Sequence, residues 1–208
     1  MLNGEDFLID VNLKDPILLN MILQYLVETI GREFSADNII NFLKSQNIKM
    51  SNETLYSYVD ALCKALILKK VNRYDVRGKK ILKTLNKYYA TDLGIAQIKN
   101  SNPEFKSYIV LENIVYNELI DRDYEVYIGK TKTGEVDFIA IKDNQVKYIQ
   151  VTYEMYGHES TIEREFNALK KIDDNYPKYV ISLDKVDMSR DGIIHLNLID
   201  FLLGKKDI

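Results

Sequence analysis

The chain has 208 residues but no tryptophan, one cysteine and three prolines. A single cysteine, Cys63, cannot form a disulfide within the chain, and its apolar neighbours favour a small buried side chain over a reactive thiol. No apolar run approaches the roughly 18 residues that a membrane span needs. Residues 1–10 are mixed and acidic, unlike a signal peptide. We therefore expect a cytoplasmic protein with no membrane partner.

Hydrophobic residues make up 46% of the chain and charged residues 28%, as in a globular protein with a buried core. The formal net charge of −3 is unevenly distributed. Residues 1–99 carry 14 Lys+Arg against 11 Asp+Glu, and the remainder carries 14 against 20. Because the two parts differ in charge, we expect two domains, residues 1–95 and 96–208.

The first of these domains has the pattern of three short helices and a β-hairpin. Asp15-Pro16 is a helix start, and Gly31 is typical of a helix end. Ser35 and Ser51 are expected to cap two more helices. Their buried stripes would be Ile39, Ile40 and Leu43, then Leu55, Val59, Leu62 and Leu66. Residues 66–74 and 81–89 flank a polar turn and predict a hairpin. This order is that of a winged helix-turn-helix.

The hairpin is the best candidate for contact with DNA. The third helix would expose Glu53 and Asp60, which are unfavourable near phosphates. Between Lys69 and Lys87, by contrast, Asp75 is the only acid. The predicted DNA-binding residues are Lys69, Lys70, Arg73, Arg77, Lys79, Lys80 and Lys83. Such a ribbon suits salt-dependent contact with a phosphate backbone. The alternatives are a solvated ribbon or a surface that docks on an acidic neighbouring domain.

The second domain predicts an α/β/α sandwich, so the class of the whole chain is α/β, α+β overall. A helix over residues 103–122 precedes three strands, 124–128, 135–141 and 146–152. Ser160 and Glu163 form a capping box for a helix to residue 172. Strands 179–181 and 193–196 follow, and Asp200 is expected to cap a last helix.

This order places acidic residues where metal-dependent nucleases carry theirs. Such enzymes hold Mg²⁺ with one acid on the first helix, a second on the middle strand and an acid-x-lysine triplet on the next strand. Glu112 and Asp137 fill the first two places and are the candidate metal ligands. Gln150 and Thr152 stand in the third place, so the catalytic lysine is missing. We expect no cofactor, and Mg²⁺ only if this site is active.

Other residues near this site are weaker candidates. Lys147 lies an odd number of residues from Gln150 and is predicted to point to the opposite face of the strand. Lys130 and Lys132 are candidates to reach the site from the preceding turn. Further candidate ligands are Glu135, two residues before Asp137, and the acids Glu159, Glu163 and Glu165, for which a solvated helix face is the simpler interpretation. His158 and His195 lack metal-ligand spacing, and His195 is interpreted as structural.

Several segments together resemble one prokaryotic family. They are Asp15-Pro16-Ile17-Leu18-Leu19, Phe34-Ser35-Ala36, Tyr74-Asp75-Val76-Arg77-Gly78-Lys79, residues 87–94, Leu111-Glu112-Asn113-Ile114-Val115-Tyr116-Asn117-Glu118-Leu119, Glu135-Val136-Asp137-Phe138, Tyr148-Ile149-Gln150-Val151, Ile162-Glu163-Arg164-Glu165-Phe166 and residues 174–180. In this order they look like the C-terminal region of AAA-type ATPases with a C-terminal domain of unknown function.

The resemblance implies a winged helix followed by a restriction-endonuclease-like, PD-(D/E)xK, domain. It also implies an ATPase domain as a partner, but the chain contains no G-x-x-x-x-G-K-[ST] phosphate loop, so ATP hydrolysis is not assigned to it. We therefore expect a non-catalytic, DNA-binding regulatory module. The alternatives are a protein-interaction module and an active Mg²⁺-dependent nuclease that uses Glu112, Asp137 and Gln150.

Overall fold

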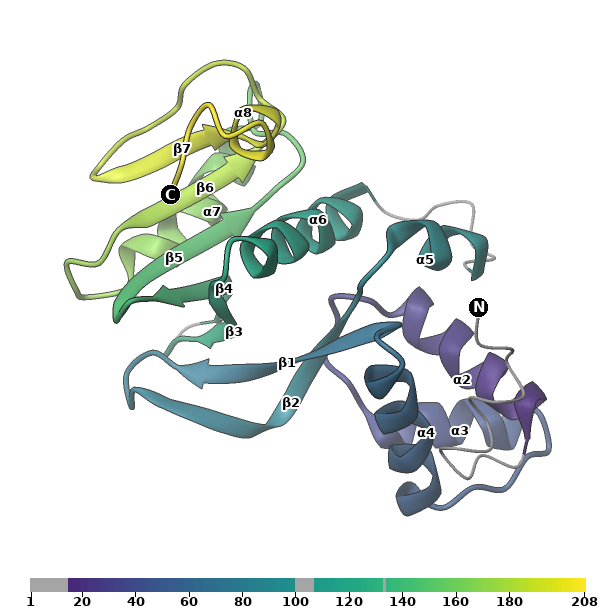
Figure 1. Ribbon diagram of the computed structural model, residues 1–208. Coiled ribbons are helices and arrows are strands. Elements are labelled where there is room, and N and C mark those ends of the chain that lie inside the picture. Colours follow the sequence, from purple (N-terminus) through teal and green to yellow (C-terminus); the bar gives the residue numbers. More distant parts are fainter. Residues whose placement is uncertain (1–14, 100–106, 133) are drawn as a thin grey trace. The chain divides into compact units, whose positions relative to one another are not determined.

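The computed structural model describes residues 15–99, 107–132 and 134–208 (Figure 1). The chain divides into two compact units. Among the described residues, the first unit comprises 15–70 and 87–99, and the second comprises 71–86 and everything from residue 107 onward. The distal half of the hairpin thus groups with the second unit. The boundary between residues 95 and 96 stays a prediction.

Three helices of the first unit begin at the predicted caps. They are α2 (Pro16–Glu28), α3 (Ala36–Ser45) and α4 (Asn52–Lys64). The Asp15 carboxylate accepts hydrogen bonds from the backbone N–H groups of Ile17 and Leu18, at 2.9 and 3.1 Å. Ser35 and Ser51 each accept one such bond, at 3.3 and 3.1 Å. These contacts satisfy N–H groups that lack a partner in the first helical turn.

The buried faces of these helices follow the predicted stripes, with one error. Ile39, Ile40 and Leu43 are buried on α3, and Leu55, Val59 and Leu62 are buried on α4. Leu66 was predicted to extend the α4 stripe, but it lies beyond the helix with a φ of 56° and is 69% exposed. The short helix α5 (Leu93–Lys99) is not among the predicted elements.

Seven strands form one mixed sheet in the order β2-β1-β3-β4-β5-β6-β7. The strands are β1 (Leu68–Asp75), β2 (Lys80–Ala90), β3 (Glu125–Lys130), β4 (Glu135–Lys142), β5 (Gln145–Val151), β6 (Lys178–Ser182) and β7 (Ile193–Asn197). The predicted hairpin of β1 and β2 is present. Asp143 and Asn144, both with positive φ, make the two-residue turn from β4 to β5, which suits the twist of a hairpin.

The hairpin joins this sheet through β1, which pairs in parallel with β3. Asp75 is opposite Lys130 in the register, and the Val76 N–H donates to the Lys130 carbonyl at 3.0 Å. Strands β3, β4 and β5 form an antiparallel meander, and β6 and β7 add in parallel to β5. Strands β1, β3, β5, β6 and β7 therefore all end at one edge of the sheet, where β4 begins. We call it the carboxyl edge.

Helices lie on both faces of the sheet in the second unit. On α6 (Ser107–Asp121), the Tyr116 ring lies 6.0 Å from the ring of Phe138 in β4. On α7 (Glu159–Lys170), Phe166 belongs to the core cluster that contains Ile139. Phe138 and Ile139 are neighbours in a strand and point to opposite faces, so the two helices cover different faces. The short α8 (Leu198–Leu202) follows β7.

Two predicted helix caps in the second unit are wrong. Ser160 lies inside α7, whose N-cap is His158 without a side-chain cap bond. The cap of α8 is Asn197, which accepts from the N–H groups of Ile199 and Asp200 at 3.0 and 3.1 Å. Asn197 also donates to two carbonyls of the β6–β7 loop, and these extra bonds fix it in the capping position. The predicted first residues of α6, 103–106, lie outside the described residues.

The fold is mixed α/β, which confirms the predicted class at that level. In the part of the chain that the structure describes, none of the helices combines the length and the apolar character needed to cross a membrane.

Gly129 offers a test of the packing in β3. A Cβ atom there would lie 3.0 Å from Cγ1 of Ile139 and 3.1 Å from Cβ of Val136. We expect Gly129→Ala to lower the free energy of unfolding by about 1–3 kcal/mol, as overpacking does. Gly134→Ala is the control, since no atom lies within 4 Å of a Cβ there. Urea unfolding of the three proteins measures this, and equal stabilities of both variants would contradict the described β3–β4 packing.

Candidate functional site

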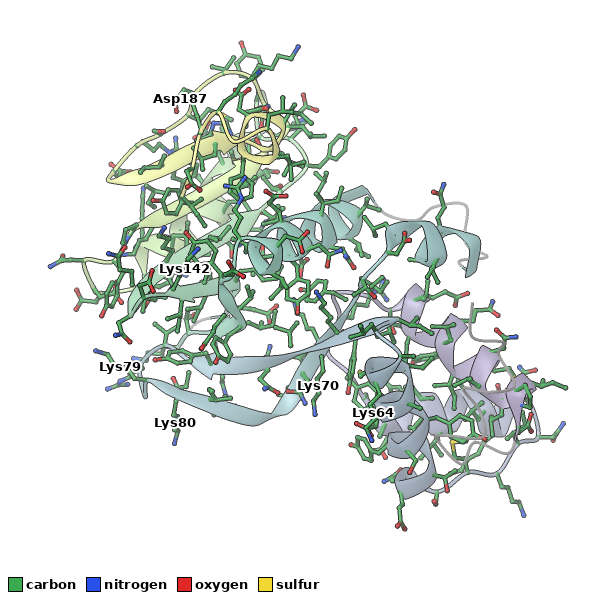
Figure 2. All side chains as sticks on the ribbon, in the orientation of Figure 1. Lys64, Lys70, Lys79, Lys80, Lys142 and Asp187 are labelled. Carbon is green, nitrogen blue, oxygen red and sulfur yellow. The ribbon has the colours of Figure 1, made fainter. Side chains whose placement is uncertain are left out.

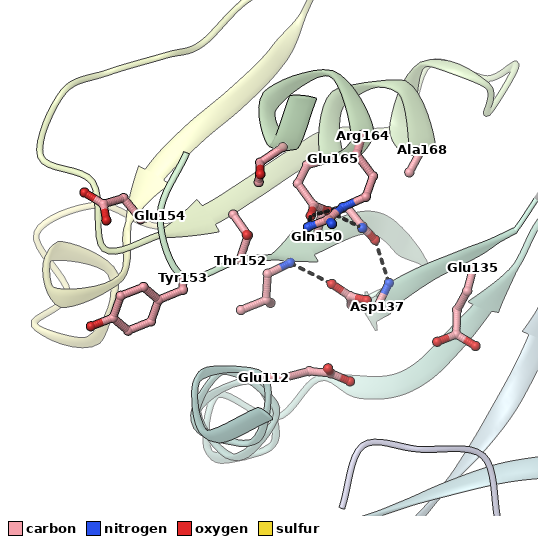
Figure 3. A pocket seen from close by; sticks show the side chains of 12 residues that line it. Glu112, Glu135, Asp137, Gln150, Thr152, Tyr153, Glu154, Arg164, Glu165 and Ala168 are labelled. Carbon is pink, nitrogen blue, oxygen red and sulfur yellow. Dashed lines mark hydrogen bonds and ion pairs between the residues drawn. The ribbon is translucent and has the colours of Figure 1, made fainter. Parts of the chain in front are cut away.

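An open pocket of about 650 Å³ lies at the carboxyl edge of the sheet in the second unit (Figure 3). Strands β4 and β5, the segment after β5, and helices α6 and α7 supply its walls. The lining residues are Glu112, Glu135, Asp137, Gln150, Val151, Thr152, Tyr153, Glu154, Thr161, Arg164, Glu165 and Ala168. The pocket is therefore rich in carboxylates.

The three predicted catalytic residues, Glu112, Asp137 and Gln150, all line this pocket. Glu112 is buried on α6, and its side chain points toward the beginning of β4 (Figure 3). Asp137 accepts a hydrogen bond at Oδ2 from the N–H of Val151, 2.8 Å away, so this carboxylate bridges β4 and β5. The three residues thus line one pocket, and their catalytic and metal-binding roles stay a prediction.

The buried Gln150 side chain uses both ends of its amide within the protein. Its Oε1 accepts from the backbone N–H of Asp137 at 2.8 Å, and its Nε2 donates to Oε2 of Glu165 at 2.7 Å. The other Glu165 oxygen accepts from Nε and Nη2 of Arg164, at 3.0 and 2.6 Å. Gln150 therefore ties β5 to both β4 and α7.

Glu165 is a member of the site that the sequence interpretation undervalued. A solvated helix face was the simpler interpretation of Glu159, Glu163 and Glu165, but Glu165 is 4% exposed. Its position was informative, since it lies three residues after Ile162 and directly before Phe166, at the border of the buried stripe. Glu159 and Glu163 are exposed and do not line the pocket.

No lysine lines the pocket among the described residues. Thr152, at the position where the sequence analysis expected a nuclease lysine to be replaced, lines the pocket and carries no charge. Lys147 points away, as predicted, and donates to the Tyr124 hydroxyl at 2.8 Å. Lys130 and Lys132, the candidates to reach in from the β3–β4 turn, are exposed and do not line it either. The pocket's cation is instead Arg164, which is paired with Glu165.

Two of the oxygens that were candidates to hold a catalytic Mg²⁺ ion are already hydrogen-bonded within the protein. Such an ion needs several oxygen ligands at about 2.0–2.1 Å with near-octahedral geometry. Gln150 Oε1 and Asp137 Oδ2 already accept backbone hydrogen bonds. Within residues 15–99, 107–132 and 134–208, no three His, Cys, Asp or Glu side chains are grouped as a metal site. We therefore derive no step through a metal.

Six of the seven predicted DNA-binding cations fall into three groups. Arg77, Lys79 and Lys80 are exposed at the hairpin turn, and Figure 2 shows Lys79 and Lys80 extending from it. In the first unit, Lys70 is exposed and Lys69 is half-buried. Arg73 is buried and forms an ion pair with Glu135 of the pocket wall, so its charge is not presented at the surface. The Lys83 side chain lies outside the described residues.

A buried hydrogen-bond network anchors the segment that follows β5. Asp184 accepts from the backbone N–H groups of Met155 and Tyr156, at 2.8 and 3.1 Å, and from the Ser182 hydroxyl at 2.6 Å. Burial opposes ionisation, but these bonds hold the pKa of Asp184 below its usual value. One wall of the pocket, Tyr153 and Glu154, is therefore held to the end of β6.

His195 on β7 completes this network and is structural, as predicted. Its Nε2 lies 2.9 Å from the Ser182 hydroxyl, and its Nδ1 accepts from the Met188 N–H at 3.3 Å. Only a neutral imidazole accepts a bond at Nδ1. Burial lowers the pKa of His195 below its usual value, although Asp184 and Asp187 oppose that shift.

Comparison with known proteins finds only proteins without an assigned activity. Residues 4–104 match a family model described as "Domain of unknown function (DUF8612)". An uncharacterized protein of Haemophilus influenzae is 35% identical over 191 residues, which cover 91% of this chain and 47% of that protein. An uncharacterized protein of Methanocaldococcus jannaschii is 32% identical over 164 residues, 77% of this chain and 35% of the relative.

The chain thus spans about half the length of one curated relative and about a third of the other. No solved structure matches it. Both relatives match across the two units, but their names state no reaction, ligand or partner. The site must therefore be interpreted from its own geometry.

The hydrogen bond between Gln150 and Glu165 can be tested by placing a negative charge at position 150. Gln150→Glu would place a second carboxylate against Glu165, which raises the pKa of the pair because both cannot ionise together. A group with a raised folded-state pKa stabilises below its unfolded pKa and loses that stabilisation as pH rises. We expect the variant to lose about 1–3 kcal/mol of unfolding free energy at pH 7.5 and less at pH 5.

Chemical denaturation at the two pH values measures this difference. Gln145→Glu is the matched control, because Gln145 is exposed at the start of the same strand. Equal losses at both pH values, or an equal loss in the control, would show that Gln150 and Glu165 do not interact as described.

The lowered pKa of His195 predicts how stability depends on pH. A depressed folded-state pKa means that stability is fully present above the unfolded value of about 6.5 and falls as pH decreases. One such group contributes a slope of up to about 1.4 kcal/mol per pH unit. We expect His195→Gln to lose less stability than the wild type between pH 7.5 and 5.5, as measured by thermal unfolding. His158→Gln, at an exposed site, should retain it, and the reverse pattern would contradict the assignment.

Proposed function

We propose that this chain is a non-catalytic nucleic-acid-binding module. In this proposal the first unit is a winged helix, and the second is a restriction-endonuclease-like domain with a degenerate nuclease site. The order of three helices and a hairpin supports the first assignment. An acid on α6, an acid on the middle strand of the meander and polar residues on the next strand support the second.

The observation that carries the loss of catalysis is the double use of the Gln150 amide. An acid at this position would offer an anionic oxygen to a metal, whereas the Gln150 oxygen accepts from Asp137 N–H and its nitrogen donates to Glu165. Thr152 supplies no positive charge to orient water or stabilise a developing phosphorane. The position thus acts as a structural link between β4, β5 and α7.

The cations of the hairpin turn support nucleic acid as the ligand. Arg77, Lys79 and Lys80 lie close together in the sequence, are exposed, and project from a narrow turn. Such a group suits the phosphate backbone, which gives salt-dependent binding with little sequence preference. Since Arg73 is withdrawn into an ion pair, we place the contact at the turn and not along the whole hairpin.

We further propose that this module regulates an AAA-type ATPase that lies on the same or a partner chain. The motif resemblance supports this, and the length of the relatives is compatible with it, because more than half of each lies outside the matched region. In that arrangement the ATPase domain would perform the hydrolysis, and this module would provide the contact with nucleic acid.

The test is binding of fluorescent single-stranded and duplex DNA across a salt series, with and without Mg²⁺ or Mn²⁺, followed by a gel. We expect affinity to fall steeply with salt and the DNA to stay intact. Lys79→Glu/Lys80→Glu should reduce the affinity at least tenfold. The control, Lys142→Glu/Lys171→Glu, changes two exposed lysines at the opposite edge of the sheet and should leave binding largely unaltered.

Two results would overturn this proposal. Metal-dependent cleavage that disappears in Asp137→Ala would show an active nuclease. A complete lack of binding at low salt would leave a protein-interaction module as the better interpretation.

A further inference from the structure

The parallel pairing of β1 with β3 brings two basic turns together at the carboxyl edge. The hairpin turn carries Arg77, Lys79 and Lys80, and the end of β3 carries Lys130 and Lys132. Because Asp75 is opposite Lys130 and the Val76 N–H binds the Lys130 carbonyl, the two turns begin side by side. All five side chains are exposed. We call these five residues the turn cations.

Two exposed tyrosines lie further along the same edge. Tyr153 is 46% exposed at the pocket rim (Figure 3), and Tyr156, three residues further along the segment after β5, is 63% exposed. This segment is well fixed, because Asp184 accepts the N–H groups of Met155 and Tyr156 and the Tyr153 carbonyl accepts from Leu183 at 3.0 Å. A rigid, exposed aromatic ring is a ready surface for a flat ligand group.

The spacing between these features fits a short nucleic-acid strand. Three inter-strand steps separate β1 from β5, which amounts to about 14 Å. A stacked strand advances about 3.4 Å per nucleotide, so about four nucleotides cover that distance. The acidic pocket lies between the two ends, which favours neutral bases over phosphates above it. Glu135 and Glu165 are already paired with arginines, which reduces the repulsion.

We propose that the carboxyl edge binds single-stranded nucleic acid: the turn cations hold its phosphates, and Tyr153 stacks on an unpaired base. Base–aromatic stacking requires bases that are not enclosed in a duplex. Lysine clusters alone would suit duplex DNA or an acidic protein equally well. The exposed ring of Tyr153 at the pocket rim is what favours a single strand. This inference rests on the proposed nucleic-acid-binding function and specifies its surface and its ligand.

The experiment is fluorescence anisotropy with a labelled 12-nucleotide strand of mixed sequence and with its 12-base-pair duplex, in EDTA and over a salt series. We expect the full chain to bind the single strand at least tenfold more tightly. Lys130→Gln/Lys132→Gln should reduce the slope of log K against log salt by about 1.4. Tyr153→Leu should weaken binding roughly 5- to 150-fold, and Tyr153→Phe, which keeps the ring, should weaken it less.

Lys142→Gln/Lys171→Gln is the matched control, since it removes the same charge from exposed sites at the opposite edge. Thermal unfolding of each variant verifies that it is folded. If the wild-type chain binds neither probe, the proposed function itself fails. If it binds but the edge variants match the control, nucleic acid binds elsewhere and only this inference fails. If the chain binds the duplex as tightly as the single strand and Tyr153→Leu has no effect, the ligand of this edge is the backbone of a duplex and not a single strand.

Discussion

The parallel pairing between β1 and β3 is the constraint on which the second unit depends. Without it the hairpin would be a two-stranded ribbon, which is marginally stable on its own in water. With it, β1 becomes an inner strand, Tyr74 and Val76 pack against the core cluster, and Arg73 pairs with Glu135. The same pairing sets the hairpin turn next to the β3–β4 turn. One backbone register thus determines the core, the pocket wall and the basic surface together.

Gln150 is a second link, of a different kind. Its amide joins the backbone of β4 to a carboxylate on α7, so a single buried side chain connects three elements around the pocket. Buried polar groups are costly unless both donor and acceptor are satisfied, and here both are. A glutamate in this position would need a cation opposite Glu165 to avoid repulsion. The amide removes that need, and in the proposed nuclease-like domain the same amide would leave this position without an anionic metal ligand.

The sequence predicted those features that depend on neighbouring residues. The caps at Asp15, Ser35 and Ser51 and the stripes of α3 and α4 are local patterns of one or two turns. The cap of α8 failed because Asn197 and Asp200 are both good capping residues, and bonds from Asn197 to a distant loop decided between them. The pairing of β1 with β3 places Arg73 opposite Ile128, which is far away in the sequence. The spacing of apolar residues within a segment cannot predict such a pairing. Glu165 was misjudged for a similar reason, since its partner Gln150 lies on another element.

In the proposed function, the residues that bind phosphate lie on other elements than the residues of the degenerate nuclease site. Binding can therefore persist when catalysis is lost. The turn cations belong to the hairpin and the end of β3, whereas the degenerate site belongs to β4, β5, α6 and α7. In that proposal, Thr152, directly after β5, stands for a nuclease lysine and leaves the pocket without that charge, while the turns are unaffected. Phosphate contacts act over several ångströms and tolerate small displacements, whereas metal catalysis requires ligands placed within tenths of an ångström. Substitutions at the pocket would therefore abolish cleavage long before they weakened binding at the edge of the sheet.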